Sequence, residues 1–264
     1  MFKQIKDQLS NEIQYNIPLG RIISTVPSQT EFLHDLGLEK EVVGITKFCI
    51  YPNDWFRNKT RIGGTKDLKI DTITALNPDL IIGNKEENQR EQIEELQRNF
   101  PVWMSDIVTF EDALEMMQMI GELVDKSEKA GAIIQDILNK KRNFELKITN
   151  KKRRKVAYFI WRKPYMTAAN GTYIHEMLRI FGAENVFEHQ ERYPEIDLAD
   201  LAKYDIDTIF LSSEPYPFQE KHFEEFQAVC PNAKIILVDG EAFSWYGSRM
   251  LKAFDYFEAL WEDF

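Results

Sequence analysis

Short apolar runs alternate with amphipathic stretches along the first third of the chain. The runs cover residues 22–26, 42–45 and 80–82. Helical patterns lie between them, the first over residues 28–36 and the second from about residue 71. Apolar runs separated by helical patterns are typical of a parallel sheet with connecting helices. The segment therefore predicts the order strand, helix, strand, helix, strand.

Local signals set the ends of the first helix. Pro27 interrupts the first apolar run, and Ser28 is followed three residues later by Glu31. This spacing predicts a capping box in which Ser28 is the N-cap. Gly37 follows the last apolar position and predicts the end of the helix.

A much longer helix is predicted near the middle of the chain. Residues 127–149 carry apolar side chains at spacings of three and four, without an internal proline. About 23 helical residues would extend roughly 35 Å. We therefore expect an N-terminal lobe over residues 1–125, a linking helix over 126–150, and a C-terminal lobe over 151–264.

The second half repeats the pattern of the first. A strand is predicted over residues 155–160, a helix over 172–181 and strands over 208–210 and 234–238, with a final helix over 247–261. The expected fold class is α/β, with two lobes that each contain a mainly parallel sheet flanked by helices. One long helix would join the lobes and leave a cleft between them, a favoured position for ligand sites.

Composition narrows the functional classes. The formal net charge of −10 argues against a nucleic-acid partner. No apolar window is long enough for a membrane span, and residues 1–18 lack the apolar core of a signal peptide, so the sequence alone indicates a cytoplasmic protein. Cys49 and Cys230 are far apart without metal-type spacing, and we expect two buried free thiols in a monomeric protein.

The motifs of common enzymes and metal sites are missing from the sequence. It contains no GxGxxG, P-loop, GxSxG or HExxH, and its histidines lack metal-ligand spacing. We expect no catalysis, no cofactor and no bound metal ion. Aromatic and cationic side chains gather instead in the loops after predicted strands, where they suit a bulky ligand. These candidates are Lys47, Phe48, Tyr51, Lys66, Trp161, Arg162, Tyr165, Tyr193, Phe243, Trp245, Tyr246 and Arg249.

Five segments, taken in order, resemble a known family. They read RIISTVPSQTEFLHDLG, GITKFCIYP, IGGTKDLKIDTITALNPDLII, MTAANGTYIHEMLRIFGAENVF and FSWYGSRM. Over about residues 20–262 the chain resembles the substrate-binding proteins of ABC importers for cobalamin, ferric siderophores and haem, and it is most similar to the cobalamin-binding branch. The resemblance implies a periplasmic or lipoprotein-anchored protein that binds a metal chelate between two lobes.

The resemblance also implies residue roles. Asp71 and Asp200 correspond to acidic residues that dock on an ABC permease. Cobalamin binders of this family often carry an aromatic residue where this chain has Lys66, which keeps a ferric siderophore as the alternative ligand. A cytoplasmic enzyme or metal-chelate chaperone on the same scaffold is the alternative of another class, with Cys49, Cys230 and His175 as possible cofactor ligands. The ligand contacts that the resemblance implies are Ser28, Gln29, Tyr51, Gly64, Thr65, Lys66, Tyr165, Thr167, Phe243, Trp245 and Arg249.

Overall fold

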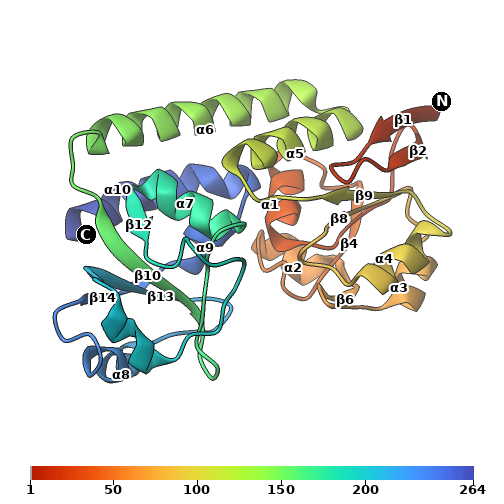
Figure 1. The fold of residues 1–264 in the computed structure, drawn as a ribbon. Coiled ribbons are helices and arrows are strands. Elements are labelled where there is room, and N and C mark those ends of the chain that lie inside the picture. The colour runs from red at the N-terminus through yellow and green to blue at the C-terminus, as the bar shows by residue number, and fades with distance from the viewer. Residues whose placement is uncertain (1) are drawn as a thin grey trace. The chain divides into compact units, whose positions relative to one another are not determined.

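The computed structural model describes residues 2–264 (Figure 1). The chain forms two compact units, in agreement with the two predicted lobes. Unit 1 contains the chain up to Ile107, together with Glu111–Asp136 and Tyr246–Arg249. Unit 2 contains Val108–Phe110, Ile137–Trp245 and Met250–Phe264. Among the described residues, no helix has both the length and the apolar character that crossing a membrane would require.

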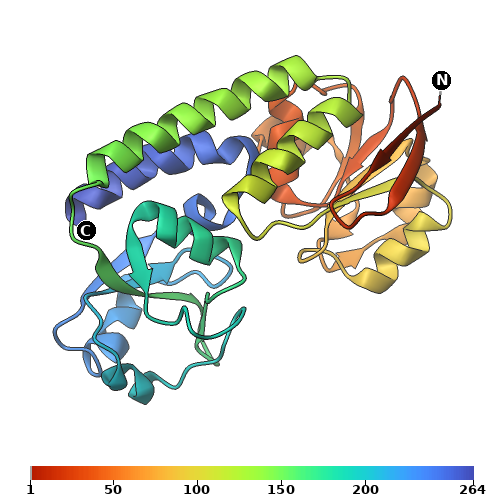
Figure 2. The same cartoon turned by 45° about the horizontal axis from the view of Figure 1, so that its top comes forward.

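Unit 1 is built on a five-stranded parallel sheet with the strand order β5-β4-β3-β8-β9. Figures 1 and 2 show α1 and α5 on one side of this sheet and α3 and α4 on the other. The buried strand residues Ile23 and Ile81 pack with Ile62 and Ile73 in one apolar core. The elements of the sheet layer are β3 (Ile22–Ser24), α1 (Pro27–Asp35), β4 (Val42–Ile45), β5 (Thr60–Arg61), α3 (Ile70–Leu76), β8 (Leu80–Asn84), α4 (Arg90–Gln97), β9 (Val102–Ser105) and α5 (Phe110–Leu123).

Smaller elements complete this unit. An antiparallel hairpin, β1 (Phe2–Lys6) with β2 (Glu12–Asn16), precedes the sheet. The short helix α2 (Asn53–Asn58) follows the loop after β4. A second small hairpin pairs β6 (Gly63–Gly64) with β7 (Asp67–Leu68).

Unit 2 has a mainly parallel sheet as well. Its order is β11-β10-β13-β14, with β12 also paired to β10 and β11 the antiparallel member. Helices α7 and α10 lie on one side and α8 on the other (Figure 1). The elements are β10 (Arg154–Trp161), β11 (Met166–Thr167), α7 (Tyr173–Phe181), β12 (Ala183–Asn185), η1 (Leu198–Lys203), β13 (Thr208–Ser212), η2 (Glu220–His222), α8 (Phe223–Gln227), β14 (Lys234–Val238), α9 (Gly240–Ser244), η3 (Gly247–Arg249) and α10 (Met250–Asp263), of which η3 belongs to unit 1.

The long helix is confirmed. Helix α6 runs without interruption over Ser127–Ile148. The boundary between the two compact units falls inside α6, between Asp136 and Ile137.

The predicted capping box of the first helix is wrong. Helix α1 begins at Pro27, with Val26 at the N-cap and no side-chain cap. Proline suits the first helical position because its fixed φ is already helical and its missing N–H needs no partner there. Instead of closing a capping box, the Glu31 carboxylate forms an ion pair with Arg249.

The last helix also starts later than predicted. Residues Gly247–Arg249 form a 3-10 turn, and α10 begins at Met250. Gly247 has a φ of +83°, which does not continue a right-handed helix. In contrast, the predicted end of α7 is confirmed, because Gly182 is its C-cap in the left-handed conformation.

Candidate ligand-binding loops

The loop after β4 exposes aromatic side chains of unit 1. Phe48 retains 51% and Tyr51 39% of their accessible surface. Large apolar side chains with this much exposure provide contact area for a ligand. The Lys47 ammonium lies 5.1 Å from the centre of the Phe48 ring. The Phe48 ring also packs closely against Gly64. A Cβ atom at Gly64 would lie only 3.1 Å from Phe48 Cε2, so a glycine suits this position.

Arg249 lies beside Tyr51 and belongs to the same unit. Its guanidinium carbon is 4.4 Å from the centre of the Tyr51 ring. Its Nε atom donates a 2.7 Å hydrogen bond to Glu31 Oε2. The two side chains of this ion pair are only 10% and 7% exposed. The positive charge of Arg249 is therefore already balanced by Glu31, a residue that the sequence interpretation assigned to helix capping.

The segment Tyr246–Arg249 is anchored against α1. At Gly247, a Cβ atom would lie 3.4 Å from both Phe32 Cβ and the Ser28 carbonyl oxygen, so the backbone approaches the helix closely. Tyr246 is buried. Burial raises the pKa of its phenol well above the ordinary value. Ser28 and Tyr246 thus take part in this anchor.

The predicted contact loop at Gly64–Lys66 has one exposed member. Thr65 is buried, and its carbonyl oxygen accepts a 3.0 Å hydrogen bond from Asn88 Nδ2. Lys66 is exposed, and its ammonium donates to the carbonyl oxygen of Glu86. The lysine therefore lies along the surface of unit 1 in this conformation.

In unit 2, Trp161 is the exposed aromatic residue at the end of β10. It retains 39% of its accessible surface and packs edge-on against Tyr216, with the ring centres 5.9 Å apart. Its neighbour Arg162 is engaged by Glu225 through two hydrogen bonds, Nε to Oε1 at 2.9 Å and Nη2 to Oε2 at 3.0 Å. Such fork-shaped pairing satisfies the guanidinium and holds it in place.

The pKa values around Arg162 follow from this pairing. Burial raises the pKa of Glu225, but the hydrogen bonds from Arg162 and Tyr165 and the charge of Arg162 outweigh it and leave the pKa lowered. Burial, followed by the interaction with Glu225, raises the pKa of Tyr165 to about 12. At neutral pH the arrangement is a closed ion pair with a neutral phenol beside it.

Several predicted contacts are buried instead. Gln29, Thr167 and Phe243 have no accessible surface, so their side chains would not touch a ligand in this conformation, and their role as contacts stays a prediction. Phe243 packs against Tyr158, at 5.3 Å between ring centres. Trp245 is 9% exposed, and its Nε1 atom donates a 2.9 Å hydrogen bond to Glu214. Aromatic composition alone does not distinguish side chains packed in a core from side chains that face a ligand.

The cations of the predicted site are largely engaged. Arg162 and Arg249 are in ion pairs, and Lys66 is bonded to a carbonyl oxygen. Lys47 covers an aromatic ring. Phe48, Tyr51 and Trp161 are exposed aromatic side chains of these loops, and Lys47 and Lys66 are exposed beside them.

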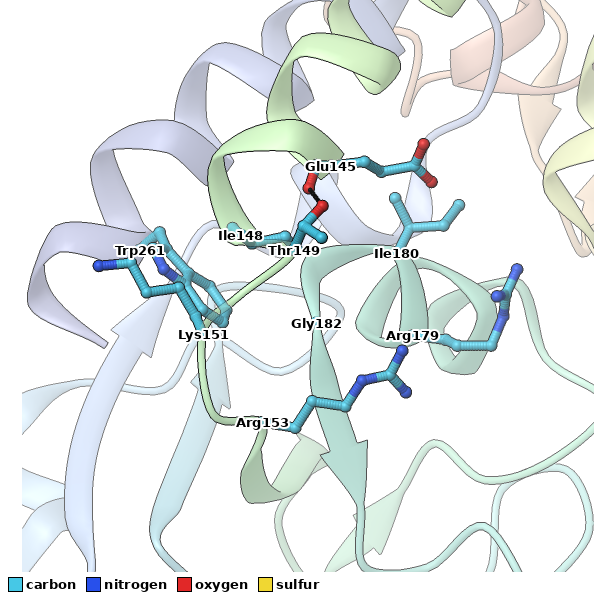
Figure 3. A pocket seen from close by; sticks show the side chains of 9 residues that line it. All are labelled: Glu145, Ile148, Thr149, Lys151, Arg153, Arg179, Ile180, Gly182 and Trp261. Atoms are coloured by element: carbon cyan, nitrogen blue, oxygen red, sulfur yellow. Dashed lines mark hydrogen bonds between the residues drawn. The ribbon is translucent and has the colours of Figure 1, made fainter.

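A pocket of ≈ 210 Å³ lies elsewhere in unit 2, at the end of α6 (Figure 3). Three cationic residues line it, but Figure 3 shows Lys151 extending along Trp261, away from Arg153 and Arg179. Arg179 is already paired with Glu176 at 2.8 Å. The pocket contains none of the predicted ligand contacts. Its lining residues are Glu145, Ile148, Thr149, Lys151, Arg153, Arg179, Ile180, Gly182 and Trp261.

The enzyme alternative rests on three possible cofactor ligands, Cys49, Cys230 and His175. Cys49 and Cys230 are buried free thiols, as predicted, and burial raises the pKa of both. A thiol with a raised pKa is a weak nucleophile at neutral pH. Burial lowers the pKa of His175, whose Nδ1 atom contacts Asn185 at 3.2 Å. Cys49 belongs to unit 1 and the other two residues to unit 2.

The fold and the exposed aromatic loops define a class, the two-lobed α/β binding proteins with a long linking helix. A family model for periplasmic binding proteins matches residues 22–228, and the chain belongs to this family. The vitamin B12-binding protein of Vibrio parahaemolyticus is 24% identical over 199 residues, covering 75% of this chain and 72% of that protein.

Solved structures show the same fold. The periplasmic vitamin B12 binding protein BtuF of Vibrio cholerae superposes with a TM-score of 0.79 at 20% identity, covering 93% of this chain and 99% of that chain. A periplasmic heme binding protein from Pseudomonas aeruginosa gives a TM-score of 0.79 at 18% identity, covering 91% of this chain and 92% of that one. All three of these relatives are named as binding proteins.

Proposed function

We propose that this protein binds a corrinoid, with cobalamin as the first candidate, and delivers it unchanged to an ABC importer. In this role it acts outside the cytoplasmic membrane. The family membership supports a binding role, and relatives named for vitamin B12 binding support the ligand class.

The pairing of Arg249 with Glu31 is the observation that carries the choice of ligand. Ferric siderophore complexes are often acidic, and a site for them would present unpaired cations to the ligand. Here the guanidinium of Arg249 is balanced by a buried carboxylate, and that of Arg162 by Glu225. The exposed rings of Tyr51 and Trp161 favour a bulky ligand held through apolar contact.

Calorimetric titration tests the ligand. Purified protein is titrated with cobalamin, cobinamide, haem, and catecholate and hydroxamate ferric complexes. The proposal expects saturable binding of a corrinoid at one site per chain, with the absorption spectrum and mass of the corrinoid unchanged after release. If only a ferric complex binds, the ligand is a siderophore and not cobalamin. If no compound binds, the proposed binding function is refuted.

Delivery to an importer is tested separately at the predicted docking residues. Asp71 lies exposed in the first turn of α3. Asp200 is exposed as well, but it pairs with Lys203 at 2.6 Å, so its charge is partly balanced within the unit. Reversing Asp71 to Lys is expected to leave corrinoid affinity unchanged and to weaken binding to a reconstituted permease. Equal permease binding by the Asp71→Lys variant would contradict the docking role.

A further inference from the structure

Three side chains with metal-binding atoms converge on the surface of unit 1. His34 lies in the last turn of α1, Glu39 lies in the following loop, and Asp54 lies in the first turn of α2. One potential ligand atom from each lies within 4.8 Å of the other two. His34 and Glu39 are close in sequence, and the fold brings Asp54, from the start of α2, next to them.

The donor set suits a first-row divalent cation. One imidazole and two carboxylates provide one nitrogen and at least two oxygen ligands, a combination found for zinc. Ligand atoms on one zinc ion are roughly 3–3.5 Å apart, because each metal bond is about 2 Å long. Glu39 and Asp54 are exposed, so side-chain rotation can close the remaining distance.

The surroundings of the three residues match those of metal ligands. The Nδ1 atom of His34 contacts Asp35 Oδ1 at 3.3 Å. Metal-bound histidines commonly donate their second ring nitrogen to a carboxylate, which orients the ring and leaves the other nitrogen for the ion. The ring of His34 also packs edge-on against the buried Trp55, at 5.2 Å between ring centres. Trp55 Nε1 in turn donates a hydrogen bond to Glu39.

A lysine currently supplies positive charge to this cluster. Lys59 Nζ is 3.5 Å from Glu39 Oε1 and 5.0 Å from the centre of the Trp55 ring. A bound divalent cation would compete with this ammonium for the Glu39 carboxylate. Removing the charge of Lys59 should therefore strengthen the binding of a cation by Glu39. If Glu39 served only in an ordinary surface ion pair, removing Lys59 would not create tighter cation binding.

We propose that His34, Glu39 and Asp54 form a binding site for a divalent transition-metal ion, with zinc as its representative. Asp54 is three residues beyond Tyr51, and His34 is three residues beyond Glu31. A bound ion would join the end of α1 to the start of α2. It would thereby fix the loop that presents Tyr51. The site is independent of the proposed corrinoid function.

The test is a zinc titration of chelator-treated protein without any other ligand, followed by calorimetry and metal analysis. The expected result is one zinc per chain. His34→Gln and Asp54→Asn should each weaken binding at least about tenfold, and Asp35→Asn by about tenfold. Lys59→Met, which keeps the aliphatic stem, should tighten binding.

His189→Gln is the matched control, because His189 is an exposed histidine outside the cluster. It should leave the titration unchanged. Circular dichroism of each variant establishes that the variants are folded. Failure of the wild-type protein to bind zinc stoichiometrically, or binding that survives both His34→Gln and Asp54→Asn, would overturn the site. If the Lys59→Met variant binds zinc with unchanged or lower affinity, Glu39 is not a ligand of the site.

Discussion

At the scale of single residues, exposure differs between two tryptophans that the sequence pattern treats alike. Trp161 and Trp245 both follow strand-rich segments in the sequence, and both were predicted to line the site. In the structure Trp161 is 39% exposed, whereas Trp245 is 9% exposed and hydrogen bonded to Glu214. The sequence pattern could not distinguish them, because aromatic residues serve cores and binding surfaces alike.

Truncating these two tryptophans should produce different effects. Trp161→Ala should weaken corrinoid binding by about 1–3 kcal/mol and leave the melting temperature nearly unchanged. Trp245→Ala should lower the free energy of unfolding by about 3–5 kcal/mol, because it leaves a cavity and removes the Nε1 donor from Glu214. Calorimetric affinity and thermal unfolding of both variants measure this contrast. If the Trp245→Ala variant is stable but binds the corrinoid more weakly, Trp245 is a ligand contact.

The buried ion pair is expected to be a strong local determinant of stability. Glu31→Gln leaves the guanidinium of Arg249 buried without its counter-charge, which should cost about 3–5 kcal/mol. Denaturant unfolding measures the loss. Glu94→Gln is the control, because it removes one partner of the exposed pair with Arg90, and it should cause no measurable change. Equal behaviour of the two variants would show that Arg249 does not depend on Glu31.

At the scale of elements, strong local signals were predicted well and competing signals were not. The unbroken apolar spacing of residues 127–149 and the glycine at 182 identified α6 and the end of α7 correctly. The start of α1 was misassigned, because Ser28 and Glu31 have the spacing of a capping box while a distant residue, Arg249, determines what Glu31 does. Local spacing does not encode such a contact.

Two glycine substitutions test this interpretation of the helices. Gly182 has a φ of +88°, and a Cβ atom there would lie 2.8 Å from Ile148 Cδ1. Gly182→Ala should therefore lower the free energy of unfolding by about 1–2 kcal/mol or more. Gly131→Ala, inside α6 with open space around the position, should raise it by about 0.5–1 kcal/mol. Chemical denaturation decides both, and destabilisation by Gly131→Ala would argue against a regular helix at that position.

At the scale of the whole molecule, the sequence predicted the architecture more fully than the site. Two α/β units and their long helix follow from repeated apolar periodicity, which depends on neighbouring residues. The site depends on which loop side chains remain exposed after packing. Phe48, Tyr51 and Trp161 remain exposed, and Gln29, Thr167 and Phe243 do not. The expected cleft between the lobes stays a prediction.

A competition experiment shows which class of ligand the protein selects. Purified protein is dialysed to equilibrium against an equimolar mixture of cobalamin, haem and a ferric catecholate, and the retained compound is identified by its absorption spectrum. Because the guanidinium groups of Arg249 and Arg162 are already paired with carboxylates, we expect cobalamin to be retained at one equivalent per chain. Retention of the ferric catecholate in its place would contradict it.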